Sequence, residues 1–164
     1  MEALWGFLGT IVGAGVSIAT SCISNRHEIM RQQQADSLER IERARAFQRE
    51  NLLEVQQTIQ DMMRFYTRMQ HEDCVAFRQS GEWGKVRLSE EVNEGSRATN
   101  AKLAVLTVRI ADDEVRDAIK TLVSRIAKHH VAKTEEEAEF IIMDATDAVI
   151  PLMERIGKTL RSLY

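Results

Sequence analysis

The chain has 164 residues, of which 29% are charged, and its formal net charge at pH 7 is −3. This balance gives no strong signal for nucleic-acid binding, and two cysteines do not make the disulfide framework of a small secreted protein. One proline, few aromatic residues and no strand-like alternation predict an all-α protein whose helices each bury an apolar stripe.

The first predicted element, residues 1–25, is a transmembrane helix. Its core, Ala3 to Ile23, carries no charged residue, and its length of ~31 Å matches the ~30 Å hydrocarbon layer of a bilayer. Only Glu2 lies between Met1 and this run, so the basic region of a signal peptide is missing and we expect the helix to be retained. The alternative is an apolar helix buried in the core of an oligomer.

Positive charge after this segment predicts its orientation. Arg26 and Arg31 follow it closely, whereas no lysine or arginine precedes it. The positive-inside rule then places the rest of the chain in the cytoplasm. We therefore predict a single-pass protein of the inner (plasma) membrane.

Small residues recur every fourth position within the apolar segment, at Gly9, Gly13, Ser17 and Ser21. Lipid tails provide no hydrophobic force that pairs helices, so close backbone approach at small residues has to supply the contact. This series predicts a helix face for self-association, and the expected partners are therefore the lipid bilayer and further copies of the chain. Small residues are also common in membrane helices that do not associate.

Residues 26–50 are predicted to form a helical stalk. No glycine or proline interrupts the chain from Arg26 to Gln79, which favours one long helix. Apolar residues spaced three and four apart form a weak stripe in the stalk, because Arg45 and Gln48 stand at two of its positions. The stripe is strong after the stalk. We interpret the stalk as a solvated helix or a contact between subunits. The strong part of the stripe consists of Leu52, Val55, Ile59, Met62, Tyr66 and Met69.

Residues 51–164 are predicted to form an antiparallel four-helix bundle. A loop that carries Trp83 follows the long helix, and Ser89, Asp112 and Thr134 are expected to cap the helices after it. Pro151 is expected to kink or break the last helix. The predicted buried residues of these helices are Val92, Thr99, Leu103, Leu106 and Ile110, then Val115, Ile119, Leu122 and Ile126, then Phe140, Ile141, Ala145, Ala148, Leu152, Ile156 and Leu160.

Motifs for catalysis are scarce. The sequence has no glycine-rich phosphate loop, HExxH, CxxC or GxSxG, and it predicts neither a metal nor a cofactor. The remaining candidate is Arg125 with His130, in which the histidine would move the proton of a ribose hydroxyl and the arginine would stabilise the phosphate. Residues five apart in a regular helix point ~140° away from each other, so the pair converges only if the helix ends between them. The alternative is that His129 and His130 occupy a helix C-terminus, where the helix dipole favours them.

The arginine and histidine, spaced R-x4-H in a helical bundle, resemble the HEPN superfamily, many of whose members cut RNA without a metal. Ile126 departs from that pattern, because a polar residue commonly follows the arginine. The combination of one membrane helix with such a bundle resembles the small membrane accessory proteins of type VI-B CRISPR loci. That resemblance implies a ring-shaped membrane pore in antiviral defence, with a CRISPR effector or RNA as a further partner.

Three functions follow as hypotheses. The first is a homo-oligomeric membrane protein that forms a pore through Gly9, Gly13, Ser17 and Ser21. The second is a membrane-tethered ribonuclease that uses Arg125 and His130, although residues 88–147 carry 13 acidic against 8 basic side chains. The third is a membrane-anchored adaptor whose bundle binds a soluble partner. We expect a protein that is not an enzyme.

Overall fold

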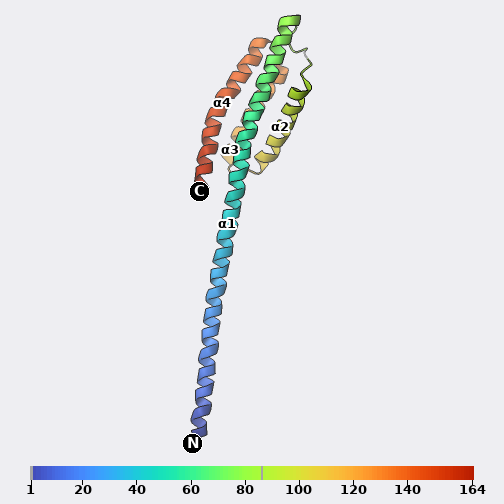
Figure 1. The fold of residues 1–164 in the computed structure, drawn as a ribbon. Coiled ribbons are helices and arrows are strands. Elements are labelled where there is room, and N and C mark those ends of the chain that lie inside the picture. The colour runs from blue at the N-terminus through green and yellow to red at the C-terminus, as the bar shows by residue number, and fades with distance from the viewer. Residues whose placement is uncertain (1, 86) are drawn as a thin grey trace. The chain divides into compact units, whose positions relative to one another are not determined.

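The protein is all-α, as predicted. A computed structural model describes the backbone of residues 2–85 and 87–164 and the side chains of residues 24–85 and 87–164, and within these residues there is no strand. Figure 1 shows the order of its elements along the chain. These are α1 (Glu2–Ser80), α2 (Glu90–Val108), α3 (Asp113–Ala127), the 3-10 helix η1 (Lys128–Val131) and α4 (Glu135–Ser162).

The chain divides into two units, residues 1–44 and residues 45–164. The predicted transmembrane segment, residues 1–25, lies almost wholly outside the residues whose side chains are described. The four small residues Gly9, Gly13, Ser17 and Ser21 all fall in that part. Across 24–85 and 87–164, no helix is both apolar enough and long enough to cross a bilayer.

The second unit is a bundle of four helical segments that alternate in direction, as Figure 1 shows for the end of α1 and for α2, α3 and α4. The predicted stripe on α1, from Leu52 to Met69, is confirmed, because every one of its side chains is at most 3% exposed. The other helices contribute the rest of one continuous core. That core includes Val92, Leu103, Leu106 and Ile110, then Val115, Ile119, Leu122 and Ile126, then Ala145, Leu152 and Ile156.

The predicted helix starts are also confirmed. Ser89 Oγ accepts a hydrogen bond from the backbone N–H of Val92 at 3.4 Å, and Thr134 Oγ1 accepts one from Glu137 at 3.1 Å. The Glu137 carboxylate in turn accepts from the N–H of Lys133 at 2.8 Å. Such caps satisfy backbone donors that the first turn of a helix leaves without partners.

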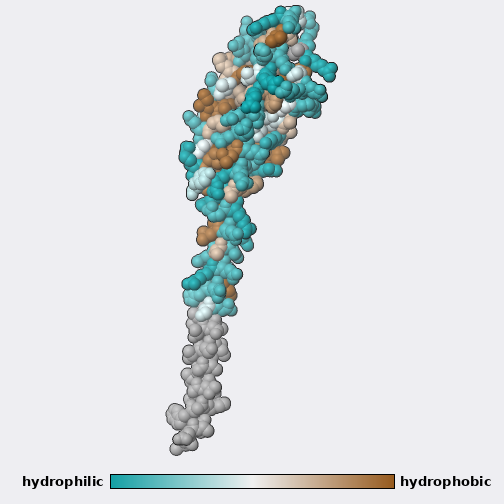
Figure 2. All heavy atoms as spheres, in the orientation of Figure 1, coloured by the Kyte–Doolittle hydropathy of each residue, from teal (hydrophilic) through white to brown (hydrophobic). Residues whose placement is uncertain are grey.

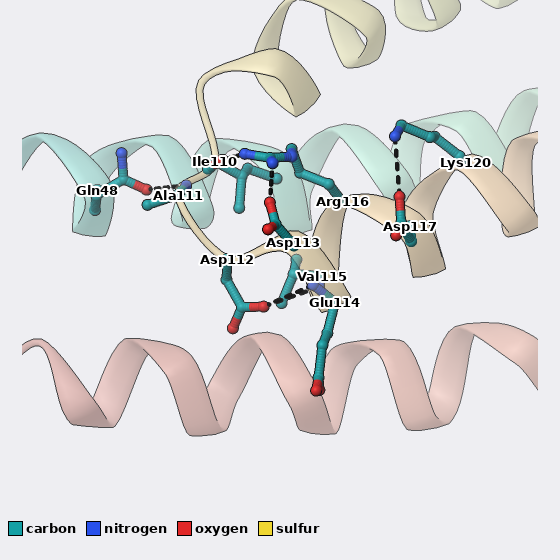
Figure 3. Close-up of polar contacts among 10 residues, drawn as sticks. All are labelled: Gln48, Ile110, Ala111, Asp112, Asp113, Glu114, Val115, Arg116, Asp117 and Lys120. Atoms are coloured by element: carbon teal, nitrogen blue, oxygen red, sulfur yellow. Dashed lines mark hydrogen bonds and ion pairs between the residues drawn. The ribbon is translucent and has the colours of Figure 1, made fainter.

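The turn between α2 and α3 is held by side chains from its neighbours (Figure 3). Gln48 of α1 donates to the Arg109 carbonyl at 2.8 Å and accepts from the Ala111 N–H at 2.9 Å. Asp112 caps α3 by accepting from the Glu114 and Val115 N–H groups, at 3.0 and 3.1 Å. Gln48 interrupts the apolar stripe because its amide binds this turn.

Two predictions for the last helix were wrong in part. Pro151 does not break α4, which continues to Ser162. The proline and Asp147, whose carbonyl the ring deprives of an intrahelical donor, are both exposed, so water can satisfy that carbonyl. Phe140 was expected to be buried but is 62% exposed.

Candidate functional site

The candidate pair lies where the third helix ends. Helix α3 stops at Ala127, and the chain continues as the 3-10 turn η1, which contains both histidines. One regular helix therefore does not extend from Arg125 to His130, as the convergence of the two side chains requires. The direction that each side chain then takes depends on the helix that it contacts.

Arg125 binds the last helix. Its Nη1 lies 3.0 Å from Asp144 Oδ1 of α4, and both side chains are roughly two-fifths exposed. An ion pair at such a surface position contributes little to stability, typically less than about 1 kcal/mol. The contact nevertheless directs the guanidinium toward α4.

His130 binds the first helix instead. Its Nε2 lies 3.1 Å from the hydroxyl oxygen of Tyr66 on α1, and the two rings are tilted with centroids 5.5 Å apart. The same hydroxyl oxygen accepts a hydrogen bond from Asn100 of α2 at 3.4 Å. The hydroxyl hydrogen can then be donated to the imidazole. His130 as a whole is exposed to solvent.

His129 is buried beside it and is only 4% exposed. Its Nε2 lies 2.6 Å from Gln70 Oε1, and Gln70 donates through its amide nitrogen to the Cys74 sulfur at 3.3 Å. Burial, together with the smaller effect of the neighbouring His130, lowers the pKa of His129 to about 4. His129 is therefore neutral at pH 7 and donates a hydrogen bond to Gln70.

Groups that border the two histidines also have shifted pKa values. Burial raises the pKa of the Asp73 carboxyl, as does Glu72, whereas His130 acts in the opposite direction. Burial likewise raises the pKa of the Cys74 thiol, with Glu135 adding to the effect. A thiol with a raised pKa is a poor nucleophile at neutral pH.

The loop after α1 packs against the turn that carries the two histidines. Trp83 donates from its indole nitrogen to the Ala132 carbonyl at 3.1 Å, directly after η1. Its ring packs edge-on against Phe77, with centroids 5.7 Å apart. Trp83 thus docks on the turn that carries the histidines.

The structure therefore places the two predicted site residues on different neighbours. None of the contacts among the described residues joins Arg125 to His130, and none places an arginine on Tyr66 or His129. The described residues also contain no group of three or more histidine, cysteine, aspartate or glutamate side chains that could hold a metal. The arrangement can move a proton between Tyr66 and His130, but it lacks a cation directed at the same point.

Sequence reasoning missed the polar cluster itself, which consists of Tyr66, Gln70, Asn100, His129 and His130. Tyr66 was counted only as a member of the apolar stripe. The sole local signal was that tyrosine carries a hydroxyl, which requires a hydrogen-bond partner when the side chain is buried. No protein-family model matches the chain, and neither the search of curated proteins nor that of solved structures returned a match.

Proposed function

We propose that the protein is a homo-oligomeric, single-pass membrane protein that carries a helical bundle on the cytoplasmic side. The observation that supports this is the exposure of large apolar side chains in residues 24–44. Met30, Leu38 and Ile41 are 59%, 64% and 48% exposed. At ~100° per residue these three lie within ~80° of one another around α1. A second copy of the helix would remove this strip from water.

The apolar run from Ala3 to Ile23 precedes this strip along the chain. We expect the run to anchor the protein and the series Gly9, Gly13, Ser17 and Ser21 to pair neighbouring copies. The mass of the full-length protein in mild detergent, measured by light scattering, tests the proposal. A discrete assembly of six or more copies is expected, whereas a monomer would refute it and favour the membrane-anchored adaptor.

Substitutions then test the face of the helix. Gly9→Leu and Gly13→Leu should each disperse the assembly, because leucine prevents close backbone approach. Gly15→Leu is the matched control, since Gly15 lies outside the four-residue series, and it should leave the mass unchanged. If Gly9→Leu and Gly13→Leu retain the wild-type mass, this face does not form the contact.

The resemblance to the accessory proteins of type VI-B CRISPR loci sharpens the proposal to a membrane pore in antiviral defence. A pore would release a small dye from vesicles that contain the protein, and Gly13→Leu would abolish the release. An intact assembly that releases no dye would exclude the pore while leaving the oligomer in place. A CRISPR effector as partner would be tested by co-purification with the wild-type assembly.

A ribonuclease is the second candidate, and the exposure of His130 next to the Tyr66 hydroxyl is what favours it. The ion pair of Arg125 with Asp144 argues against it. The purified protein would have to cleave single-stranded RNA in EDTA, and His130→Ala would have to abolish that cleavage. Cleavage that survives His130→Ala would not depend on His130 and would remove this candidate.

A further inference from the structure

An apolar groove runs between the second and third helices of the bundle. Its volume is about 400 Å³, and Leu103, Ala104 and Val108 of α2 face Val123 and Ala127 of α3 across it. Val108 is among the most exposed large apolar residues of the described chain. The groove is thus an apolar surface that the bundle does not fill with its own side chains.

Unpaired cations lie at both ends of this groove. Arg109 follows Val108 at one end, and Lys128 follows Ala127 at the other. Both are exposed, and neither forms an ion pair within the described residues. Lys120 lines the groove between them and is paired with Asp117 at 2.9 Å (Figure 3).

The outer face of α4 has the complementary character. Phe140, Met143 and Ile150 are all more than half exposed, and their spacing of three and seven residues places them on one side of the helix. Figure 2 shows hydrophobic side chains among hydrophilic ones on the face of the bundle where α4 lies in Figure 1. Four carboxylates flank this strip: Glu136, Glu139, Asp147 and Glu154. None of these four side chains forms an ion pair within the described residues.

The two surfaces also match in length. Asn100 and Val108 mark the extent of the groove on α2, and eight residues of helix span ~12 Å. Glu139 and Asp147 are also eight residues apart, so they too span ~12 Å, with Phe140 and Met143 between them. Each apolar surface therefore has charges at both ends, and the charges are of opposite sign.

We infer that the outer face of α4 from one copy docks into the α2/α3 groove of a second copy, with Phe140 and Met143 in the groove and Glu139 and Asp147 opposite Arg109 and Lys128. This inference rests on the proposed self-association and adds to it a contact made by the bundle. Each copy contributes two different surfaces, so the contact is head-to-tail. Repetition of such a contact produces a ring when the rotation between copies closes.

Charge reversal in the full-length protein tests the contact. The first variant is Glu139→Lys with Asp147→Lys, and the second is Arg109→Glu with Lys128→Glu. Each should lower the mass in detergent, because like charges then meet across the contact. Glu50→Lys with Glu90→Lys is the control, since it changes the net charge by the same amount as the first variant at residues outside both surfaces, and it should retain the wild-type mass.

Recombination of the variants distinguishes a head-to-tail contact from general charge repulsion. A mixture of the two variants should reassemble, because the basic α4 of the first variant meets the acidic groove of the second. The acidic α4 of the second variant likewise meets the basic groove of the first. The chain with all four substitutions should also reassemble. Circular dichroism and Trp83 fluorescence would show that each variant remains folded.

The failures of the two proposals can be told apart. A wild-type protein that is monomeric would refute the self-association and this contact together. An oligomeric wild type whose charge-reversal variants retain the full mass would refute only the contact. So would variants that disperse but do not reassemble when they are mixed.

Discussion

The buried His129 predicts a specific loss of stability in acid. Burial lowers its pKa to about 4, whereas a histidine in the unfolded chain titrates near 6.5. Between these two pH values the unfolded chain binds a proton that the folded chain does not. The stability contributed by the neutral imidazole is therefore present above pH 6.5 and is lost as the pH falls toward 4.

The magnitude follows from the two pKa values. A difference of ~2.5 units corresponds to a total of ~3 kcal/mol, of which ~2 kcal/mol is lost between pH 7 and pH 5. Other groups titrate in the same range, so the quantity to compare is the loss in the wild type against the loss in His129→Gln. The glutamine has no proton to bind, and its pH dependence should be weaker by ~2 kcal/mol over this interval.

Urea unfolding of the full-length protein, followed by fluorescence, provides the measurement. Trp83 is a suitable reporter because its indole binds the carbonyl directly after the histidine turn. His71→Gln is the matched control, since His71 is exposed on α1 and its loss removes no buried imidazole. If His129→Gln loses as much stability between pH 7 and pH 5 as the wild type, the assignment of the acid sensitivity to His129 is wrong.

Four further substitutions have expected effects on the free energy of unfolding, each measurable by urea denaturation. Ile126→Ala removes a fully buried side chain of α3 and should cost about 2–5 kcal/mol. Gly95→Ala should destabilise by about 1–3 kcal/mol, because a Cβ there overlaps the ring of Phe65, whereas Gly157→Ala meets only Arg161 at 3.5 Å and should stabilise by up to ~1 kcal/mol. Gln48→Ala should cost about 0.5–1.5 kcal/mol, because it removes the side-chain partner of the exposed Arg109 carbonyl and Ala111 N–H, and an unchanged midpoint would mean that water replaces the amide.

Features that depend on local spacing were predictable from the sequence. The stripe from Leu52 to Met69 is set by the 3.6-residue period of one helix, and the caps at Ser89 and Thr134 involve bonds within three residues. Such features require no knowledge of how the helices pack. For the same reason the stop of α3 before the histidine pair could be anticipated.

The polar cluster could not be predicted, because its contacts join distant parts of the chain. Tyr66 and His130 are 64 residues apart, and His129 and Gln70 are 59 apart. The predicted burial of Phe140 was wrong for the same reason. Phe140 fits the apolar period of α4, but only the packing of that helix decides which of its sides is covered. The series Gly9, Gly13, Ser17 and Ser21 stays a prediction.

The distribution of charge bears more directly on function than its sum. Residues 88–147 carry an acidic excess, which taken alone argues only against nucleic-acid binding. Within the described residues, Glu136, Glu139 and Asp147 on α4 form no ion pair, and neither do Arg109 and Lys128 at the ends of an apolar groove. A surface that only had to keep the protein soluble would intersperse charges of both signs. Their separation onto two surfaces, each with an apolar centre, supports the proposal that the chain binds its own copies.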